Sequence, residues 1–206
     1  MQNFTVLIPT KNRYKSLLIV LNSLNRQKTK KPIDIYIGNN GDKNLKISQD
    51  KFINLNIKIF NHKKDIGFAK NLSFLISKVV SKYFLITSDD DYYISDDMFN
   101  KIEENFNSDK NLAVQRVGFL DINIKNNFIK KKYFKNKSIL FKDHILKKDE
   151  AINIINILDG FSGIFFNKNL FQFFYTDGVI SCYFGNVLQN IKDKHFLYID
   201  KPYLLM

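Results

Sequence analysis

The N-terminal half of the chain alternates short apolar segments with amphipathic ones, and this alternation limits the folds open to it. The apolar segments, rich in β-branched residues, lie at 4–8, 33–37, 57–60 and 83–87. Over 17–24 and 68–80, apolar residues recur at three- and four-residue spacing, which indicates helices with one buried face. Strands that alternate with helices are typical of βαβ units. We therefore expect an α/β fold with a mostly parallel sheet flanked by helices.

The C-terminal half has a less regular pattern. Strands are expected over 112–120 and 195–199, a helix over 179–191, and a helical or mixed segment over 151–158. A chain of 206 residues fits one domain of ordinary size, and no stretch rich in glycine, serine or proline divides it. We therefore predict a single domain over residues 1–206.

The charge balance is strongly basic, with 32 lysines and arginines against 20 acidic residues and a net charge of +12. Such a balance suggests nucleic acid as a partner. However, only Arg13, Arg26 and Arg116 are arginines, the residue that base readout favours. We therefore predict no nucleic-acid partner, and a basic face resting on an anionic membrane is the alternative. The single cysteine, Cys182, excludes a disulfide framework and a cysteine-based zinc site.

Hydropathy bears on the location of the protein. The best apolar run, 17–21, is far shorter than the roughly 18 residues of a membrane-spanning helix. The first strand-like segment starts at Phe4, which leaves no room before it for a leader peptide. We expect a cytoplasmic protein, and its basic charge favours a peripheral contact with the inner face of the cytoplasmic membrane.

Polar residues follow directly after the predicted strands, at 9–13, 39–40, 65–67 and 89–91. In open α/β sheets, ligands bind in the crevice at the carboxyl ends of the strands. Successive side chains of an extended segment alternate in direction, so Asp89 and Asp91 can point together while Asp90 points away. Carboxylate oxygens suit magnesium or manganese, which commonly sit between carboxylates and a substrate's phosphates. An acidic loop or a helix N-terminal signal is the alternative interpretation of this triplet.

Lys70 falls in the first turn of the helix predicted over 68–80. A cation there opposes the helix dipole unless an anion shares the site. A diphosphate would supply that anion, and a plain surface lysine is the alternative.

Four segments, in order along the chain, resemble the motifs of family 2 glycosyltransferases. They are FTVLIPTKNR at 4–13, IYIGNNG at 35–41, GFAKNL at 67–72, and FLITSDDD at 84–91 followed by YISDD at 93–97. The family's counterparts are a first strand ending in Pro-Thr-x-Asn-Arg, a second ending in Asp-Asn-Gly or Asp-Asp-Gly, a Gly-x-x-x-Arg-Asn segment, and the DXD strand. The ordered set extends from Phe4 to Phe106.

This resemblance implies a GT-A, Rossmann-like fold, a nucleotide diphosphate sugar donor such as a UDP-sugar, Mn²⁺ or Mg²⁺ at the DXD motif, and inversion at the anomeric carbon. It also implies a nucleotide-sugar-binding half, 1–106, and an acceptor-binding half, 107–206. The residues that it places at the nucleotide are Pro9, Thr10, Asn12, Arg13, Asn39, Lys70, Asp89 and Asp90. The metal ligands that it implies are Asp89 and Asp91.

Two of these positions depart from the family's pattern. Asn39 stands where the family generally has an aspartate that accepts the uracil N–H, and an asparagine can accept only through its carbonyl oxygen. Lys70 replaces the more usual arginine, so it keeps the charge and loses the forked geometry. The first departure leaves the identity of the base open.

An inverting enzyme also needs a general base that deprotonates the acceptor hydroxyl. By resemblance, this is a carboxylate in a Glu-Asp pair before a late helix, and Asp177 is the first candidate, although Thr176 stands where the glutamate would be. A helix N-cap is the alternative role for Asp177. Asp159 is the second candidate for the base.

From these residues we predict a metal-dependent, inverting glycosyltransferase that moves a hexosyl or N-acetylhexosaminyl group to a hydroxyl of a glycan or glycolipid acceptor. The expected setting is bacterial surface glycan and cell-envelope polysaccharide biosynthesis. A nucleotidyltransferase is disfavoured because the loop at 9–13 contains no glycine. The alternative is a degenerate, non-catalytic domain that binds a nucleotide-sugar or docks a partner.

Overall fold

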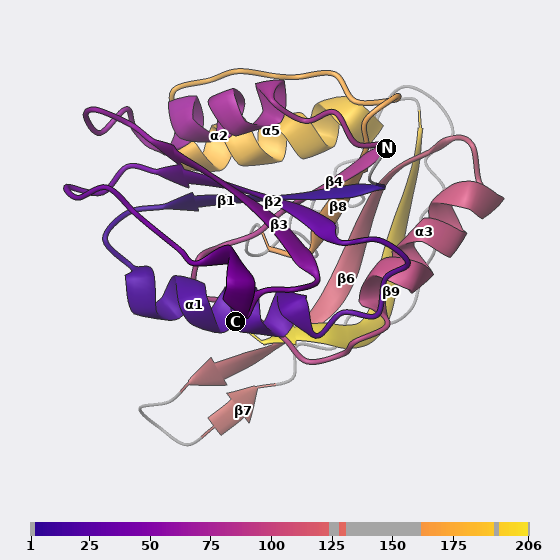
Figure 1. The fold of residues 1–206 in the computed structure, drawn as a ribbon. Coiled ribbons are helices and arrows are strands. Elements are labelled where there is room, and N and C mark those ends of the chain that lie inside the picture. The colour runs from indigo at the N-terminus through magenta and orange to yellow at the C-terminus, as the bar shows by residue number, and fades with distance from the viewer. Residues whose placement is uncertain (1–2, 124–127, 131–161, 192–193, 206) are drawn as a thin grey trace.

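The computed structural model describes residues 3–123, 128–130, 162–191 and 194–205. Its strands form one 9-stranded mixed sheet in the order β3-β2-β1-β4-β8-β6-β9-β5, and β7 pairs with β6 off this path. Helices cover both faces of the sheet: α1 and α3 lie on one side, and α2 and α5 on the other (Figure 1). The predicted α/β architecture is therefore confirmed.

Parallel strands build the N-terminal half of the sheet. Their bounds are β1 Phe4–Thr10, β2 Ile33–Asn39, β3 Leu55–Asn61 and β4 Tyr83–Ile86. All seven residues of β1 are buried, because β1 lies between β2 and β4 and is covered on both faces. Val6 pairs with Ile35 on one side and with Leu85 on the other. This explains the continuous apolar run in the sequence, which is typical of a strand buried on both faces.

The helices pack through the apolar faces that their spacing predicts. Their bounds are α1 Tyr14–Asn25, α2 Phe68–Ser77 and α3 Met98–Ser108, with a short 3₁₀ helix, η1, at Gln49–Lys51. Leu17 and Leu21 of α1 join one core with Val6, whereas Leu72 of α2 joins a second core with Leu7. Consecutive β1 residues thus point into different cores, as strand alternation requires.

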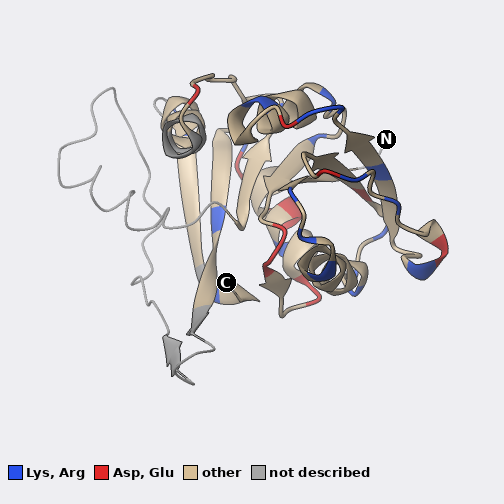
Figure 2. Ribbon diagram, turned by 90° about the vertical axis from the view of Figure 1, so that its left-hand side faces the viewer, with Lys and Arg blue, Asp and Glu red and all other residues tan. Residues whose placement is uncertain are grey.

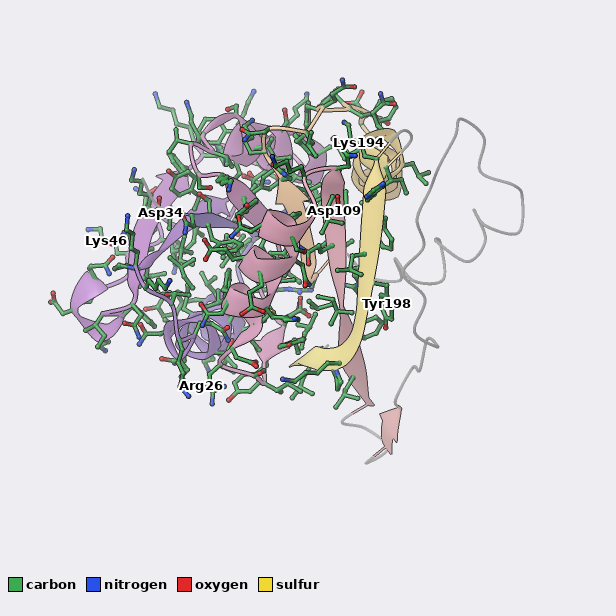
Figure 3. All side chains as sticks on the ribbon, turned by 90° about the vertical axis from the view of Figure 1, so that its right-hand side faces the viewer. Arg26, Asp34, Lys46, Asp109, Lys194 and Tyr198 are labelled. Carbon is green, nitrogen blue, oxygen red and sulfur yellow. The ribbon has the colours of Figure 1, made fainter. Side chains whose placement is uncertain are left out.

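Antiparallel pairing enters the sheet in the second half of the chain. The elements are β5 Tyr92–Tyr93, β6 Leu112–Asn123, β7 Phe128–Lys130, β8 Ile164–Asn167, α5 Val179–Ile191 and β9 His195–Leu205. Strand β8 runs antiparallel to both β4 and β6, so the sheet is parallel up to β4 and mixed beyond it. Figure 3 views the molecule from the side of α3 and β9, where His195 Nδ1 and Asp109 Oδ2 lie 2.5 Å apart.

The structure differs from the sequence prediction mainly at the ends of elements. Helix α2 stops at Ser77, short of the predicted 80, and β4 stops at Ile86, short of 87. Strand β9 continues to Leu205, well past the predicted 199, because shifts in register let it follow β6 further. The segment 151–158 lies outside the described residues. Within the described residues, no helix has the length and apolar character needed to cross a membrane.

Candidate active site

The loops that follow the parallel strands meet at one edge of the sheet, where Figure 2 shows acidic and basic segments interleaved. Two hollows open there, one beside the first turn of each flanking helix. The α2 hollow, of about 390 Å³, is lined by Pro9, Thr10, Lys11, Arg13, Asn40, Asp65, Gly67, Phe68, Asn71, Ser88 and Asp89. The α1 hollow, of about 590 Å³, is lined by Thr10, Asn12, Arg13, Tyr14, Leu17, Asn39, Asp42, Lys43, Asn44, Leu45 and Lys46.

Asp89 lies at the wall of the α2 hollow, three residues after β4 ends. Its side chain is almost fully buried and accepts hydrogen bonds from Thr10 Oγ1 at 2.6 Å and from Arg13 Nη1 at 3.3 Å. Burial raises the pKa of Asp89, and the bonds from Thr10 and Arg13 oppose that rise. The loop after β1 and the loop after β4 are therefore joined through this carboxylate.

Asp90 points away from the buried pair, as strand alternation predicts. It is exposed and lies 2.5 Å from Arg13 Nη1, and it also accepts a hydrogen bond from Ser88 Oγ. Arg13 thus contacts both Asp89 and Asp90 with one nitrogen. An exposed ion pair of this kind contributes only about 0–1 kcal/mol to stability, so its effect here is to orient Arg13.

Asp91 is buried in the same loop, with 3% of its surface exposed. Burial raises its pKa to about 6. This rise is opposed by hydrogen bonds from the Ser162 side chain and the Ser88 amide and by the positive charge of Arg116. Arg116 comes from β6 and is itself fully buried. A charged carboxylate at this position is therefore costly unless a further cation joins it.

Metal binding can be tested against these side chains. No group of three histidine, cysteine, aspartate or glutamate side chains suited to a metal occurs in the part of the chain that the structure describes. Two buried carboxylates, Asp89 and Asp91, do flank the exposed Asp90. Their raised pKa values and oxygen donors fit a hard divalent cation that takes its remaining ligands from a substrate.

Asn39 and Asn40, at the end of β2, face different hollows. Asn39 lines the α1 hollow, where its amide donates to Lys43 O at 2.9 Å and to Asn61 Oδ1 at 2.7 Å. Asn40 lines the α2 hollow, and its Nδ2 donates to Gly67 O at 3.2 Å. Of the predicted nucleotide residues, Asn39 therefore lines the α1 hollow, whereas Thr10 and Arg13 line both hollows.

The remaining predicted nucleotide residues have different surroundings. Asn12 has a positive φ of 58°. Its Nδ2 donates to Asp42 Oδ2 at 2.8 Å, and its Oδ1 accepts a hydrogen bond from the backbone N of Asp42 at 3.1 Å. Lys70 is exposed and is not among the residues that line either hollow. The next residue, Asn71, is buried and donates to Gly38 O at 2.7 Å. A position for Lys70 near a diphosphate stays a prediction.

Asp177 lies two residues before α5, which begins at the edge of the sheet where β1 and β2 end (Figure 1). Its carboxylate is exposed and accepts a hydrogen bond from Tyr175 Oη at 2.7 Å. Thr176 accepts a hydrogen bond from the Gly178 amide. Asp159 lies outside the described residues.

The segment before Asp177 is fastened along α5 by two asparagines one helical turn apart. Asn186 bonds the backbone N and O of Phe174 at 2.8 and 2.6 Å, and Asn190 bonds those of Gln172 at 2.6 and 2.8 Å. Gly185 leaves room for the Phe174 ring, since a Cβ there would lie 2.4 Å from Phe174 Cδ1. These contacts fix the backbone at Gln172 and Phe174, and so the position of the segment that leads to Asp177.

The sequence profile of Glycosyl transferase family 2 matches residues 5–170, which is most of the chain and includes β2, β3, β4 and all but the first residue of β1. The chain belongs to glycosyl transferase family 2. No curated protein sequence matches it.

Solved structures show the same fold. S. aureus TarS, residues 1–349 in complex with UDP, superposes with a TM-score of 0.74 at 16% identity, over 100% of this chain and 60% of that chain. The S. aureus TarS crystal structure matches with a TM-score of 0.74 at 17% identity, over 99% of this chain and 36% of that one. The mannosyltransferase PcManGT from Pyrobaculum calidifontis, in complex with GDP-Man and Mn²⁺, matches with a TM-score of 0.62 at 11% identity, over 99% and 56%. The chain thus spans about a third to three fifths of these proteins, and the GT-A fold is confirmed.

For this family 2 chain, sequence reasoning missed several side chains around the rim. Arg116 and Ser162, which approach Asp91, come from β6 and from the residues before β8. An arginine inside an apolar strand was the available signal for Arg116. Asn61 and Asp42, which hold the α1 hollow, carried no such signal, because their partners lie 22 and 30 residues away in sequence.

Proposed function

We propose that this family 2 chain transfers a hexosyl or N-acetylhexosaminyl group from a nucleoside diphosphate donor to a hydroxyl of an acceptor. The observation that carries the proposal is the junction at Asp89, where a buried carboxylate after β4 meets Thr10 and Arg13 at the wall of the α2 hollow. That junction brings together two of the segments that resemble family motifs. One half, 1–106, would bind the donor, and the other, 107–206, the acceptor.

The α2 hollow is the better place for the donor. It combines Asp89 with Arg13, with Lys11, which pairs with Asp65 at 2.8 Å, and with the N-terminus of α2. Gly67, the N-cap of α2, has a φ of 78° and nothing within 4 Å of where a Cβ would be, and no side chain caps the helix there. A helix N-terminus beside cations favours an anion such as a diphosphate. TarS binds UDP and UDP-GlcNAc, and PcManGT binds GDP-Man, which supports a sugar nucleotide of this kind.

Mn²⁺ or Mg²⁺ would be held by Asp91 and Asp89 together with the donor's phosphates. A divalent cation there would stabilise the negative charge that develops on the leaving phosphate. Asp89 is fixed by Thr10 and Arg13, and Asp91 by Ser88 and Ser162, so both carboxylates are oriented before the donor arrives. Preorganisation of this kind avoids reorienting charged groups during the reaction.

Asp177 is the proposed general base. It is exposed just before α5, where Tyr175 Oη donates to its Oδ1, and among the described residues no hydrogen bond occupies its other oxygen, which could accept from an acceptor hydroxyl. In a single inverting displacement, the acceptor oxygen bonds to the anomeric carbon as the bond to the diphosphate breaks, and Asp177 takes the hydroxyl proton. We propose a glycan or glycolipid acceptor, made for a bacterial surface glycan at the inner face of the cytoplasmic membrane, where a net charge of +12 would favour contact.

The test is a donor-turnover assay that follows UDP release from UDP-GlcNAc and other UDP-hexoses, with Mn²⁺ present. Asp91→Ala should abolish metal-dependent hydrolysis or transfer, with Asp50→Ala, an exposed acidic residue of η1, as the matched control. Undiminished turnover by Asp91→Ala would refute the assignment.

Thr176 in place of a glutamate before Asp177 favours one alternative, a non-catalytic nucleotide-sugar-binding domain. Tight UDP binding without turnover on any acceptor would support that alternative.

A further inference from the structure

The segment that leads into α5 carries a row of aromatic rings. The rings of Phe171, Phe173 and Tyr175 follow one another at alternate positions, with neighbouring centroids 6.5 and 6.4 Å apart. Separations of this size are typical of aromatic rings in contact. Phe171 anchors this aromatic row in the core, where its ring meets Phe84 at 4.9 Å and Phe166 at 5.2 Å, both edge to face.

The backbone of this segment is held by α5. The chain passes alongside α5 before it enters that helix (Figure 1). The buried amides of Asn186 and Asn190 each bond both the backbone N and the backbone O of one residue, Phe174 and Gln172 respectively. The Phe174 ring also lies against Gly185 of α5. Because side chains of an extended segment alternate, the rings of the aromatic row lie on the other face.

Two rings of the aromatic row face solvent. Phe173 is 40% exposed and Tyr175 is 44% exposed. Of the phenylalanines whose side chains the structure describes, only Phe173 and Phe174 are exposed, since such rings are usually buried. The bonds from Asn186 and Asn190 keep the backbone beneath them in place. A ligand that stacks on rings held in this way loses little free energy to ordering them.

The exposed end of the aromatic row reaches the proposed base. Tyr175 Oη donates to Asp177 Oδ1 at 2.7 Å, so the last ring is joined directly to the carboxylate. A ligand that follows the row therefore passes from apolar ring faces to a hydrogen-bond acceptor. A sugar suits both, because its C–H groups can cover an aromatic face while its hydroxyl groups project from its edge. Ligand sites commonly combine aromatic walls with a few polar groups in this way.

The charge around the aromatic row favours a neutral ligand. Over residues 169–191, which include the row and α5, Asp177 is the only charged residue, although the whole chain has a net charge of +12. Amphipathic segments that bind anionic membranes carry lysine or arginine beside their aromatic residues, and surfaces that bind nucleic acid do so too. The row is therefore a poor fit for an anionic lipid surface and a better one for an uncharged glycan.

We propose that Phe173 and Tyr175 form a platform for a neutral oligosaccharide acceptor, with its reacting unit at Asp177 and the units behind it stacked on the two rings. This inference rests on the proposed function, because it takes Asp177 as the base. It narrows the acceptor to a chain of several sugar units. Affinity for the acceptor should therefore increase with its length.

Oligosaccharide binding in the absence of a donor tests the platform directly. NMR titration, which detects weak binding, would use cello-, chito- and malto-oligosaccharides from the monosaccharide to the tetrasaccharide. In at least one series, wild-type affinity should rise by about tenfold or more from the monosaccharide to the trisaccharide. Absence of binding in every series, or affinity that does not depend on length, would overturn the proposal.

Substitutions of Phe173 separate ring stacking from general apolar contact. Phe173→Leu keeps an apolar side chain and removes the ring, so it should lower trisaccharide affinity by about tenfold. Phe173→Tyr keeps the ring and should retain the increase of affinity with length. Ile53→Ser is the matched control, because it removes an exposed apolar side chain outside the aromatic row. Equal trisaccharide affinity in wild type and Phe173→Leu would overturn the role of the ring.

A membrane contact through the aromatic row would give a different result. Wild type and Phe173→Ser should sediment equally with vesicles of phosphatidylcholine and phosphatidylglycerol, because the row carries no basic residue. Weaker sedimentation of Phe173→Ser would overturn the proposal in favour of a lipid-facing row.

Failure of the platform and failure of the proposed function are distinguishable, because the binding measurement needs neither donor nor metal. Oligosaccharide binding that depends on Phe173, without turnover of any donor, would support the platform and refute the proposed function. Donor turnover by a chain that binds no oligosaccharide would support the proposed function and refute the platform.

Discussion

Replacing Asp91 with asparagine should stabilise the metal-free protein at neutral and alkaline pH. An amide resembles the protonated carboxyl, so Asp91→Asn keeps the shape of the site and removes the buried negative charge. The Ser88 amide can still donate to the amide oxygen, and the Ser162 hydroxyl can accept from the new N–H. The positive charge of Arg116 lowers the pKa of Asp91, but burial outweighs this effect and raises the pKa to about 6.

The size of the effect follows from that pKa. Ionising Asp91 in the folded protein, where its pKa has risen from the ordinary 3.8 to about 6, costs about 3 kcal/mol at 1.36 kcal/mol for each pKa unit. The folded state binds this proton more tightly than the unfolded state, so the contribution of Asp91 to wild-type stability is greatest below pH 4 and falls as the pH rises to about 6. Asp91→Asn lacks this loss. The two proteins should be equally stable near pH 4, and the variant should be more stable by up to about 3 kcal/mol at pH 8.

Urea unfolding from pH 4 to pH 8, without metal, measures this difference directly. In thermal unfolding, each kcal/mol corresponds to about 2–4 °C in a chain of this size, so the variant's Tm at pH 8 should rise by about 6–12 °C. Excess Mn²⁺ and UDP should stabilise the wild type and leave Asp91→Asn almost unchanged. A variant that is no more stable than wild type at pH 8, or a difference that is the same at pH 4 and pH 8, would refute the reasoning.

Other substitutions test the packing and the chemistry. Gly38→Ala places a Cβ 1.9 Å from Asn71 Oδ1, and because Asn71 is buried and hydrogen-bonded, urea unfolding should show a loss of about 1–3 kcal/mol. Gly185→Ala also crowds a neighbour, but Phe174 is 44% exposed and can swing aside, so its stability should stay within about 1 kcal/mol of wild type. Equal losses in these two variants would contradict the packing argument. Asp177→Asn should keep donor affinity by calorimetry and lower turnover by about 10²–10⁴-fold, whereas a wild-type rate would place the base elsewhere.

Much of the parallel half of the fold could be predicted from local pattern. The segments at 4–8 and 33–37 are strands because they are apolar on both faces, and 17–24 is a helix because its leucines share one face. The polar rim followed from these assignments, since the carboxyl ends of parallel strands lie together. The divergent directions of Asp89 and Asp90 also followed from the two-residue period of extended chain.

The rest depended on contacts between residues far apart in sequence. That β8 inserts antiparallel between β4 and β6 cannot be read from its four apolar residues. The resemblance placed Asn39 at the base, which stays a prediction, whereas its hydrogen bonds to Lys43 O and Asn61 Oδ1 are long-range or loop contacts that no local pattern indicates. The burial that raises the pKa of Asp91 likewise comes from the packing of distant segments around it, and no local pattern indicates it.

The most direct test of the donor site is a crystal structure of the protein with UDP and Mn²⁺. The account predicts the nucleotide in the α2 hollow, with the diphosphate beside Asp89 and Arg13 and the metal in contact with Asp91. A nucleotide in the α1 hollow, or a metal away from Asp91, would contradict it.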